Sequence, residues 1–262
     1  MILRVLRLLL AFLPLAASLA AEPKPAPHIF FLIGETEYGT PTTLPAFAKA
    51  ELEPRGVRST FSVLPESGTE EFPNFDAIKD ADLLFFSVRR HAPPKAQMDA
   101  IRAHVAAGKS VVGIRTATHA FGKRKGETEG AWETFDMEVF GGHYDNHYGR
   151  EAKTFAKIVA EAAAHPILSG ISREEFAVPS HLYKYPKLAP TATRLLSARM
   201  EGRPEVEPLA WTNVVGKRRA FYTSMGAAED FEVPHFRRLL LNGIHWALGL
   251  PIPSGGRAPE RP

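Results

Sequence analysis

Basic and imidazole side chains follow directly after an apolar run in the middle of this chain. The run Ser110–Ile114 has the composition of a strand, and Arg115, Thr116 and His119 come at once after it. In open α/β sheets, ligands bind outside the carboxyl ends of the strands, so these side chains are candidates for chemistry. The chain contains no cysteine, and no G-x-S-x-G turn follows the run. The pattern therefore predicts acid–base or electrostatic chemistry and excludes a thiol nucleophile.

Two other apolar runs end in polar groups. The residues concerned are Glu35, Glu37 and Tyr38 after residues 29–33, and Arg89, Arg90 and His91 after residues 83–88. Because the carboxyl ends of parallel strands share one sheet edge, we expect all three segments to meet in one crevice. Glu35 and His119 are candidate bases there, and Arg115 could stabilise negative charge developing on an oxygen. The alternative is that Glu35 and Arg115 merely form an ion pair between two loops.

A third group lies in residues 141–149, where His143, Tyr144 and His147 stand between glycines. On a helix the two histidines would share one face and could hold zinc. The glycines and the Asp145–Asn146 pair favour a loop instead, and no third ligand stands nearby in the sequence. We therefore expect these side chains to contact substrate, and we expect no cofactor and no metal. A metal site at His143 and His147 is the less favoured alternative. The ring of Tyr144 suits stacking on a sugar face.

Alternating patterns of strand and helix must position these residues. The predicted strands are residues 29–33, 57–64, 83–88 and 111–114, with helices from Thr43 to Gly56 and over residues 94–107 between them. This alternation is typical of a parallel sheet with helices on both faces. The second half is richer in strands, with a hairpin that turns at residues 215–217 and a final helix over residues 234–248. No phosphate loop or dinucleotide fingerprint is present.

The two ends of the chain differ in composition from its centre. Residues 1–20 have the form of a secretory signal, with Arg4 and Arg7 before an apolar core too short for a good membrane span. Residues 21–28 are predicted to be a tether, residues 29–250 a single domain and residues 251–262 a disordered tail. Cleavage leaves 30 basic and 29 acidic side chains instead of 32 and 29. This balance gives no reason to expect nucleic acid as a partner, and the membrane is involved only through the export signal.

Motifs along nearly the whole mature chain resemble the trehalose-utilisation, or ThuA-like, family in its secreted bacterial form. The matching stretches are residues 34–38, 87–90, 108–121, 141–147, 165–168, 208–212, 216–226 and 241–249. The resemblance implies a flavodoxin-like, class I glutamine amidotransferase-like three-layer sandwich with a mostly parallel sheet, whose cysteine elbow has been lost. It also associates the chain with disaccharide catabolism through 3-keto-sugars. One departure is that Gly226 is followed by Ala227, where family members often have histidine.

Taken together, these features predict an exported carbohydrate-processing protein, periplasmic or secreted, that acts on a glycoside or 3-keto-sugar by acid–base chemistry. Glu35, Arg115 and His119 are the expected catalytic residues. The expected substrate contacts are Glu37, Tyr38, Arg89, Arg90, Thr116, His143, Tyr144 and His147. The alternatives are a non-catalytic sugar-binding module and, less favoured, a metal-dependent hydrolase. The sequence leaves open whether the protein is an enzyme and whether it forms a homo-oligomer.

Overall fold

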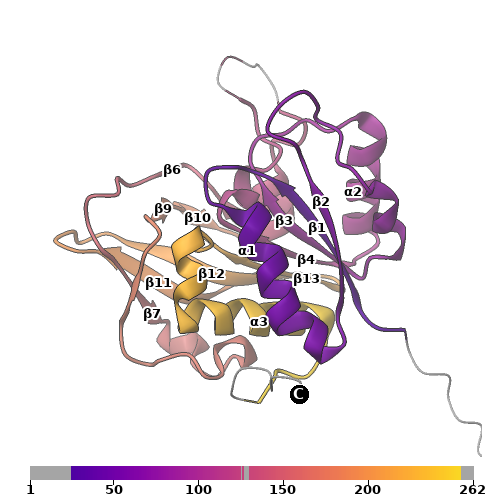
Figure 1. Ribbon diagram of the computed structural model, residues 1–262. Coiled ribbons are helices and arrows are strands. Elements are labelled where there is room, and N and C mark those ends of the chain that lie inside the picture. The colour runs from indigo at the N-terminus through magenta and orange to yellow at the C-terminus, as the bar shows by residue number, and fades with distance from the viewer. Residues whose placement is uncertain (1–24, 125, 127–129, 255–262) are drawn as a thin grey trace, which may run out of the picture.

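The chain folds around one nine-stranded sheet with helices on both faces, which confirms the predicted fold class (Figure 1). The computed structural model describes residues 25–124, 126 and 130–254. The predicted signal, residues 21–24 of the predicted tether and residues 255–262 of the predicted tail lie outside these residues. In spatial order the strands are β2 (Arg58–Val63), β1 (His28–Gly34), β3 (Leu83–Val88), β4 (Ser110–Ile114), β13 (Arg218–Thr223), β12 (Val206–Val215), β11 (Ala192–Met200), β7 (Thr154–Ile158) and β8 (Phe176–Val178).

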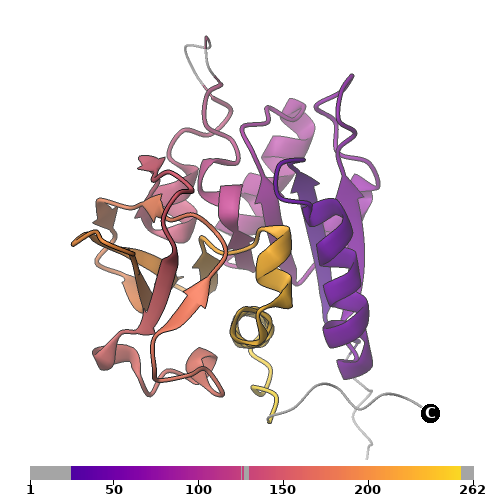
Figure 2. The same cartoon turned by 60° about the vertical axis from the view of Figure 1, so that its left-hand side comes forward.

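The sheet has a parallel half and an antiparallel half, which Figure 2 shows side by side. From β2 to β13 all neighbours pair in parallel, and from β13 to β8 all pair antiparallel. Strand β1, which lies between β2 and β3, is buried along its whole length, as expected for a strand covered on both faces. The predicted hairpin is formed by β12 and β13. Two further pairs of short strands join β5 (Gly142–His143) to β10 (Lys187–Leu188), and β6 (Asn146–His147) to β9 (Tyr183–Lys184).

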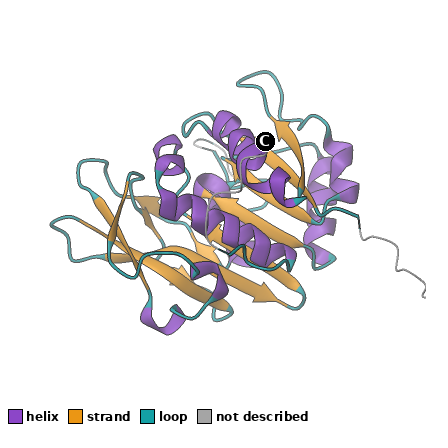
Figure 3. Ribbon diagram, turned by 60° about the horizontal axis from the view of Figure 1, so that its bottom comes forward, coloured by secondary structure: helices purple, strands orange, loops and turns teal. Residues whose placement is uncertain are grey.

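Three α-helices and several short helical turns cover the sheet (Figure 3). Helices α1 (Thr40–Phe47) and α3 (Pro234–Leu248) belong to the apolar cluster on one face, and α2 (Lys95–Ala106) to the cluster on the other. The short turns are Ala48–Leu52 and Glu53–Arg55 after α1, then Phe75–Asp80, Arg115–His119, Asp136–Phe140, Ala160–Ala162, Pro166–Leu168 and Ala228–Glu232. No helix of the described ranges has the length and apolarity needed to cross a bilayer.

The first helix begins three residues before the predicted cap at Thr43. Gly39, with φ of 72°, is the cap residue, and the amides of Thr42 and Thr43 donate to its carbonyl. The reason is the side chain of Glu35, whose carboxylate accepts the amide of Thr40 at 3.1 Å and starts the helix early. A residue five positions upstream therefore set a boundary that local propensity did not show.

Candidate functional site

Polar segments from the carboxyl ends of β1, β3, β4 and β13 lie along one edge of the sheet. β1 pairs with β3 and β3 pairs with β4 in parallel register, so the carboxyl ends of these three strands lie at one edge, as expected. The last residue of β13 pairs with the last residue of β4, Thr223 with Ile114. Arg115 and Ser224 thus leave adjacent strands at the same level.

Arg115 is the largest polar side chain at this edge, and it is completely buried. Its backbone lies in the left-handed region, with φ of 50°, a conformation that costs about 1 kcal/mol or more in a residue other than glycine. The guanidinium lies between the rings of Tyr38 and Tyr183, at 4.5 and 4.3 Å from their centroids. Among the described residues no carboxylate forms an ion pair with Arg115. Two aromatic faces therefore take the place of a counter-ion.

The terminal nitrogens of Arg115 are engaged with main chain and with one imidazole. Nη1 donates to the carbonyl oxygens of His181 and Ser224, at 2.9 and 2.6 Å. Nη2 lies 2.8 Å from Nδ1 and 3.1 Å from Nε2 of His181. Nε is buried and has no hydrogen-bond partner. Arg115 thus ties the segment before β9 to the end of β13, with one N–H still unused.

Glu35 is buried in the turn between β1 and α1, where its carboxylate accepts three hydrogen bonds. The donors are the amides of Tyr38 and Thr40, at 2.7 and 3.1 Å, and the hydroxyl of Thr40. It makes no ion pair with Arg115. This geometry fits a carboxylate that shapes the turn and aims Tyr38 at Arg115.

His119 ends the turn after β4 and stacks on Tyr144, with ring centroids 4.1 Å apart and an interplanar angle of 27°. Burial, followed by the charges of Arg90, Arg89 and Arg115, holds the pKa of His119 well below its ordinary value. The imidazole is therefore neutral at pH 7. Its Nδ1 is buried without a hydrogen-bond partner. Tyr183 follows, with its ring centroid 6.0 Å from that of His119.

A cavity of about 590 Å³ opens beside this aromatic group. Of the predicted site residues, Glu37, Tyr38 and Arg115 line it, and His119 lies behind Tyr183 and outside the lining. The other lining residues are Thr36, Gly39, Arg150, Ala152, Pro179, Ser180, His181, Ala227, Ala228 and Glu229. The cavity has room for a sugar unit. Ala227, which stands where the resemblance leads one to expect histidine, faces this same cavity.

The rim of the cavity carries a charged bridge between separate segments. Glu37 forms ion pairs with Arg150 at 2.8 Å and Arg89 at 3.5 Å. All three side chains are substantially exposed, so the bridge contributes little to stability. Arg90 lies next to it, with φ of 54°, and its amide donates to the carbonyl of His119. The bridge connects the ends of β1 and β3 with the loop that precedes β7.

His143 and His147 lie on two different short strands and have different partners. His143 Nδ1 lies 2.9 Å from the carboxylate of Asp136, and half of its side chain is exposed. His147 Nδ1 bonds the carbonyl of Tyr148, and its ring lies 4.9 Å from that of His181. Among the described residues no group of three or more potential metal ligands is present. Each histidine is thus held by protein groups from its own neighbourhood.

Buried polar atoms without partners gather at the ends of β4 and β13. Within the described part of the chain there are eleven such atoms, and four of them lie there, namely Arg115 Nε, Thr116 Oγ1, His119 Nδ1 and Ser224 Oγ. Each buried polar group left unpaired costs roughly 1–3 kcal/mol, and such groups are uncommon in folded proteins. These atoms are concentrated in two adjacent turns, and of the four residues only Arg115 also lines the cavity.

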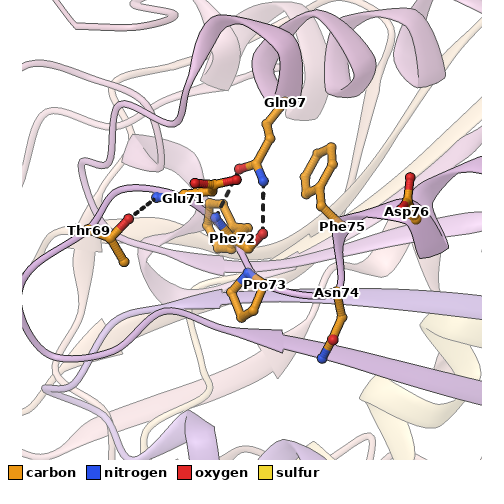
Figure 4. A pocket seen from close by; sticks show the side chains of 8 residues that line it. All are labelled: Thr69, Glu71, Phe72, Pro73, Asn74, Phe75, Asp76 and Gln97. Carbon is orange, nitrogen blue, oxygen red and sulfur yellow. Dashed lines mark hydrogen bonds between the residues drawn. The ribbon is translucent and has the colours of Figure 1, made fainter.

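A second hollow, of about 490 Å³, lies in the segment between β2 and β3 (Figure 4). Gln97 reaches down from α2 and bonds both the amide and the carbonyl of Phe72, at 2.9 and 2.8 Å. Figure 4 shows this pair of bonds beside the ring of Phe75. The Gln97 side-chain amide therefore anchors the Phe72 segment to α2. This role in folding accounts for the polar group at the second hollow, and we keep the first cavity as the candidate site.

Sequence reasoning missed the segment that closes the site from the side of β9. His181, Tyr183 and Tyr185 alternate with other residues and are all buried. Tyr183 contacts Arg115, and the Tyr185 hydroxyl bonds Thr118 at 3.0 Å. Aromatic residues at every second position indicate one face of an extended segment, and this period was the signal that could have found them. Asp136 was also missed, because nothing local marks it as the partner of His143.

Comparison with known proteins gives one family and a set of similar folds. The family model described as trehalose utilisation, ThuA, matches residues 35–247. A ThuA-like protein from Bacteroides uniformis has a TM-score of 0.63 at 18% identity, covering 88% of this chain and 95% of that one. One from Parabacteroides merdae has a TM-score of 0.59 at 16% identity, covering 88% and 93%. The protein STM1381 of Salmonella typhimurium, named as cytoplasmic, has a TM-score of 0.57 at 15% identity, covering 84% and 99%. No curated protein matches the sequence. At these identities the solved structures show the fold alone.

Proposed function

Because this chain belongs to the trehalose-utilisation (ThuA) family, we propose that it is an exported protein that processes a glycoside or 3-keto-sugar by acid–base chemistry. Membership of the family supports a role connected with carbohydrates. The observation that carries the finer proposal is the group of unpaired buried polar atoms at the ends of β4 and β13. A sugar offers hydroxyl and carbonyl groups to such atoms, and its apolar face can lie against an aromatic ring.

We assign the role of base to His119, which lies outside the cavity lining, so that a substrate reaches it only when the stacked ring of Tyr144 moves aside. Its imidazole is neutral at pH 7 because burial and neighbouring arginines lower its pKa, so it can accept a proton. A keto group acidifies the neighbouring C–H bond, and removal of that proton gives an enolate that can isomerise or expel a glycosidic oxygen. Tyr38 supplies the phenol ring that lines the cavity. Tyr144 and Tyr183 pack on His119, and burial raises the pKa of both phenols, which remain protonated.

The other predicted residues support this arrangement from the rim and the turns. Glu35 shapes the β1–α1 turn and so positions Tyr38, instead of acting as a base. Glu37, Arg89 and Arg90 border the cavity or its entrance, and Thr116 offers an unpaired hydroxyl. His143, held by Asp136, and His147, beside His181, are contacts for the more distant part of a disaccharide. The proposal requires no metal or other cofactor.

The test is a proton NMR time course of the protein lacking residues 1–20, mixed with trehalose and with its 3-keto form. New sugar resonances support an enzyme and identify the bond that changes. Saturation transfer to the sugar without new resonances supports the sugar-binding module instead. This alternative is favoured by Ala227, which lines the cavity where family members often have histidine. If neither new sugar resonances nor saturation transfer is observed, the proposal is contradicted.

His119→Ala should lower turnover at least tenfold, because a general base contributes about 10²–10⁴-fold to rate. The matched control is His165→Ala. His165 contacts Trp246 near the end of α3, and the neighbouring Ala247 bonds Ser110 at the start of β4, on the opposite edge of the sheet. The control should retain wild-type turnover. Equal turnover in all three proteins would remove His119 from the mechanism.

A further inference from the structure

The cavity floor presents hydrogen-bond donors with few free acceptors near them. His181 and Arg115 both line the cavity, and two hydrogens have no protein acceptor: one ring N–H of His181 and the Nε–H of Arg115. Tyr38, a third lining residue, accepts a hydrogen bond from the hydroxyl of Tyr183 at 3.3 Å, which leaves its own proton free. Of the two acids at the rim, Glu37 is paired with arginines and Glu229 is exposed.

The state of His181 follows from its contact with Arg115. An arginine is charged at every pH relevant to proteins, and Nη2 lies within 3.1 Å of both ring nitrogens. A positive imidazolium at that distance would place two like charges in contact inside the protein. A neutral imidazole has one acceptor nitrogen and one N–H. We take Nδ1, the nearer nitrogen, as the acceptor from Arg115, which assigns the ring proton to Nε2.

Burial and other nearby groups also favour the neutral form of the His181 ring. Burial comes first, followed by Arg115, His147 and Arg150, and together they lower the pKa of His181 to about 3. The remaining contacts are the aromatic rings of Tyr38 and Tyr183. Ser180, the residue before His181, donates to the carboxylate of Asp230. The same carboxylate also accepts the amides of Gly226 and Ala227. His181 therefore has no carboxylate partner that could hold a second proton.

We infer that His181, oriented by Arg115, is the hydrogen-bond donor for a ligand oxygen that bears full or developing negative charge. This inference rests on the proposed function and names the substrate class of the same site. Such an oxygen belongs either to the carboxylate of a sugar acid or to the enolate formed from a keto-sugar. Arg115 is a positioning residue, because its terminal N–H groups are used on His181 and on main chain. The Nε–H of Arg115 is a further unpaired donor beside His181. The buried guanidinium forms no ion pair among the described residues, and, of the carboxylates there, only the charge of the more distant Asp230 acts on it, which favours an anionic guest.

The first experiment measures the protonation of His181 directly, with no ligand. In protein labelled with ¹⁵N-histidine, long-range proton–nitrogen spectra report which ring nitrogen carries hydrogen. We expect Nε2 protonated, Nδ1 unprotonated and no change between pH 8 and pH 5. In Arg115→Gln, the pKa of the ring should rise, so that the ring begins to take up a second proton within this pH range, although burial still holds the pKa below its ordinary value. A wild-type His181 that titrates near its ordinary pKa would overturn the inference, whatever the protein does with sugars.

The second experiment compares two ligands that differ by one group, gluconate and glucitol. Wild type should bind gluconate at least about tenfold more tightly if the guest is a sugar acid, the effect of one charge-assisted hydrogen bond. His181→Phe should abolish this preference, and His181→Gln, which keeps an N–H donor, should retain part of it. Binding of gluconate in Arg115→Gln should become dependent on pH between 5 and 7, which a purely structural role of Arg115 does not predict.

A third experiment tests whether the charged oxygen belongs to an enolate. It measures, in D₂O, the exchange of the hydrogen next to the carbonyl of 3-keto-trehalose. His181→Phe should slow this exchange at least tenfold, and His181→Gln should slow it less. Preference for gluconate without any exchange or turnover would retain the inference and reject acid–base processing. Exchange or turnover that His181→Phe leaves unchanged, together with equal binding of gluconate and glucitol, would reject the inference and retain the proposed function.

Discussion

Two histidines at the same edge of the sheet are held by charged neighbours of opposite sign. His143 Nδ1 meets the carboxylate of Asp136, and His181 Nδ1 meets the guanidinium of Arg115. The carboxylate of Asp136 can accept the Nδ1–H of His143, which makes Nε2 the acceptor in the neutral ring. The guanidinium donates an N–H, so Nε2 of His181 is left with a hydrogen. The same side chain thus becomes an acceptor in one place and a donor in the other.

The two pairs also differ in depth. Half of the His143 side chain is exposed and Asp136 is nearly buried, whereas both Arg115 and His181 are buried. Arg115 further bonds two main-chain carbonyls from segments 43 residues apart in the sequence. The His143–Asp136 pair is therefore a local arrangement beside the site, whereas the His181–Arg115 pair joins separate segments of the site.

The largest expected effect is on stability. Arg115→Met should lower the free energy of unfolding by about 2–4 kcal/mol, because it leaves the carbonyls of His181 and Ser224 buried without donors. His143→Ala should lower it by less than about 0.5 kcal/mol, as is usual for an exposed side chain. Urea denaturation of the two variants measures both values. Equal losses in the two variants would contradict the difference in depth.

The next effect concerns the dependence of stability on pH. The pKa of His181 is about 3 in the folded protein, below the ordinary 6.5. Its contribution to stability is therefore complete above pH 6.5 and is lost as the pH falls toward 3. Between pH 6.5 and pH 5, wild type should lose about 1–2 kcal/mol more than His181→Gln. His104, whose pKa burial lowers to about 4, contributes the same slope to both proteins and cancels. Parallel curves would contradict the neutral state of His181.

The smallest effect belongs to the other pair and has the opposite sign. Burial raises the pKa of Asp136, so the folded protein holds this proton more tightly than the unfolded chain. Stability from this group is present at low pH and is lost as the pH rises through the folded pKa. Wild type should therefore lose stability relative to Asp136→Asn as the pH rises from 4 toward 6. A difference that stays constant with pH would show that the carboxyl is not perturbed.

Much of the fold was readable in the sequence because it depends on local patterns. The continuous apolar run of β1, the alternation of strands with helices and the span of α3 all matched prediction. The candidate site was only partly readable. Residues directly after strands, such as Arg115 and His119, were found because topology places them at one edge. His181 and Asp136 were not found, because their importance comes from partners 66 and 7 residues away.

The sequence by itself determined which side chains reach this edge of the sheet and that no thiol acts there. Which partner each of these side chains contacts depends on the folded structure. Glu35 is used on the amides of its own turn, and Arg115 is used on His181, although both were expected to act on a ligand. The physical reason is that a buried polar atom must find a partner, and the nearest partner is fixed by packing between segments distant in sequence.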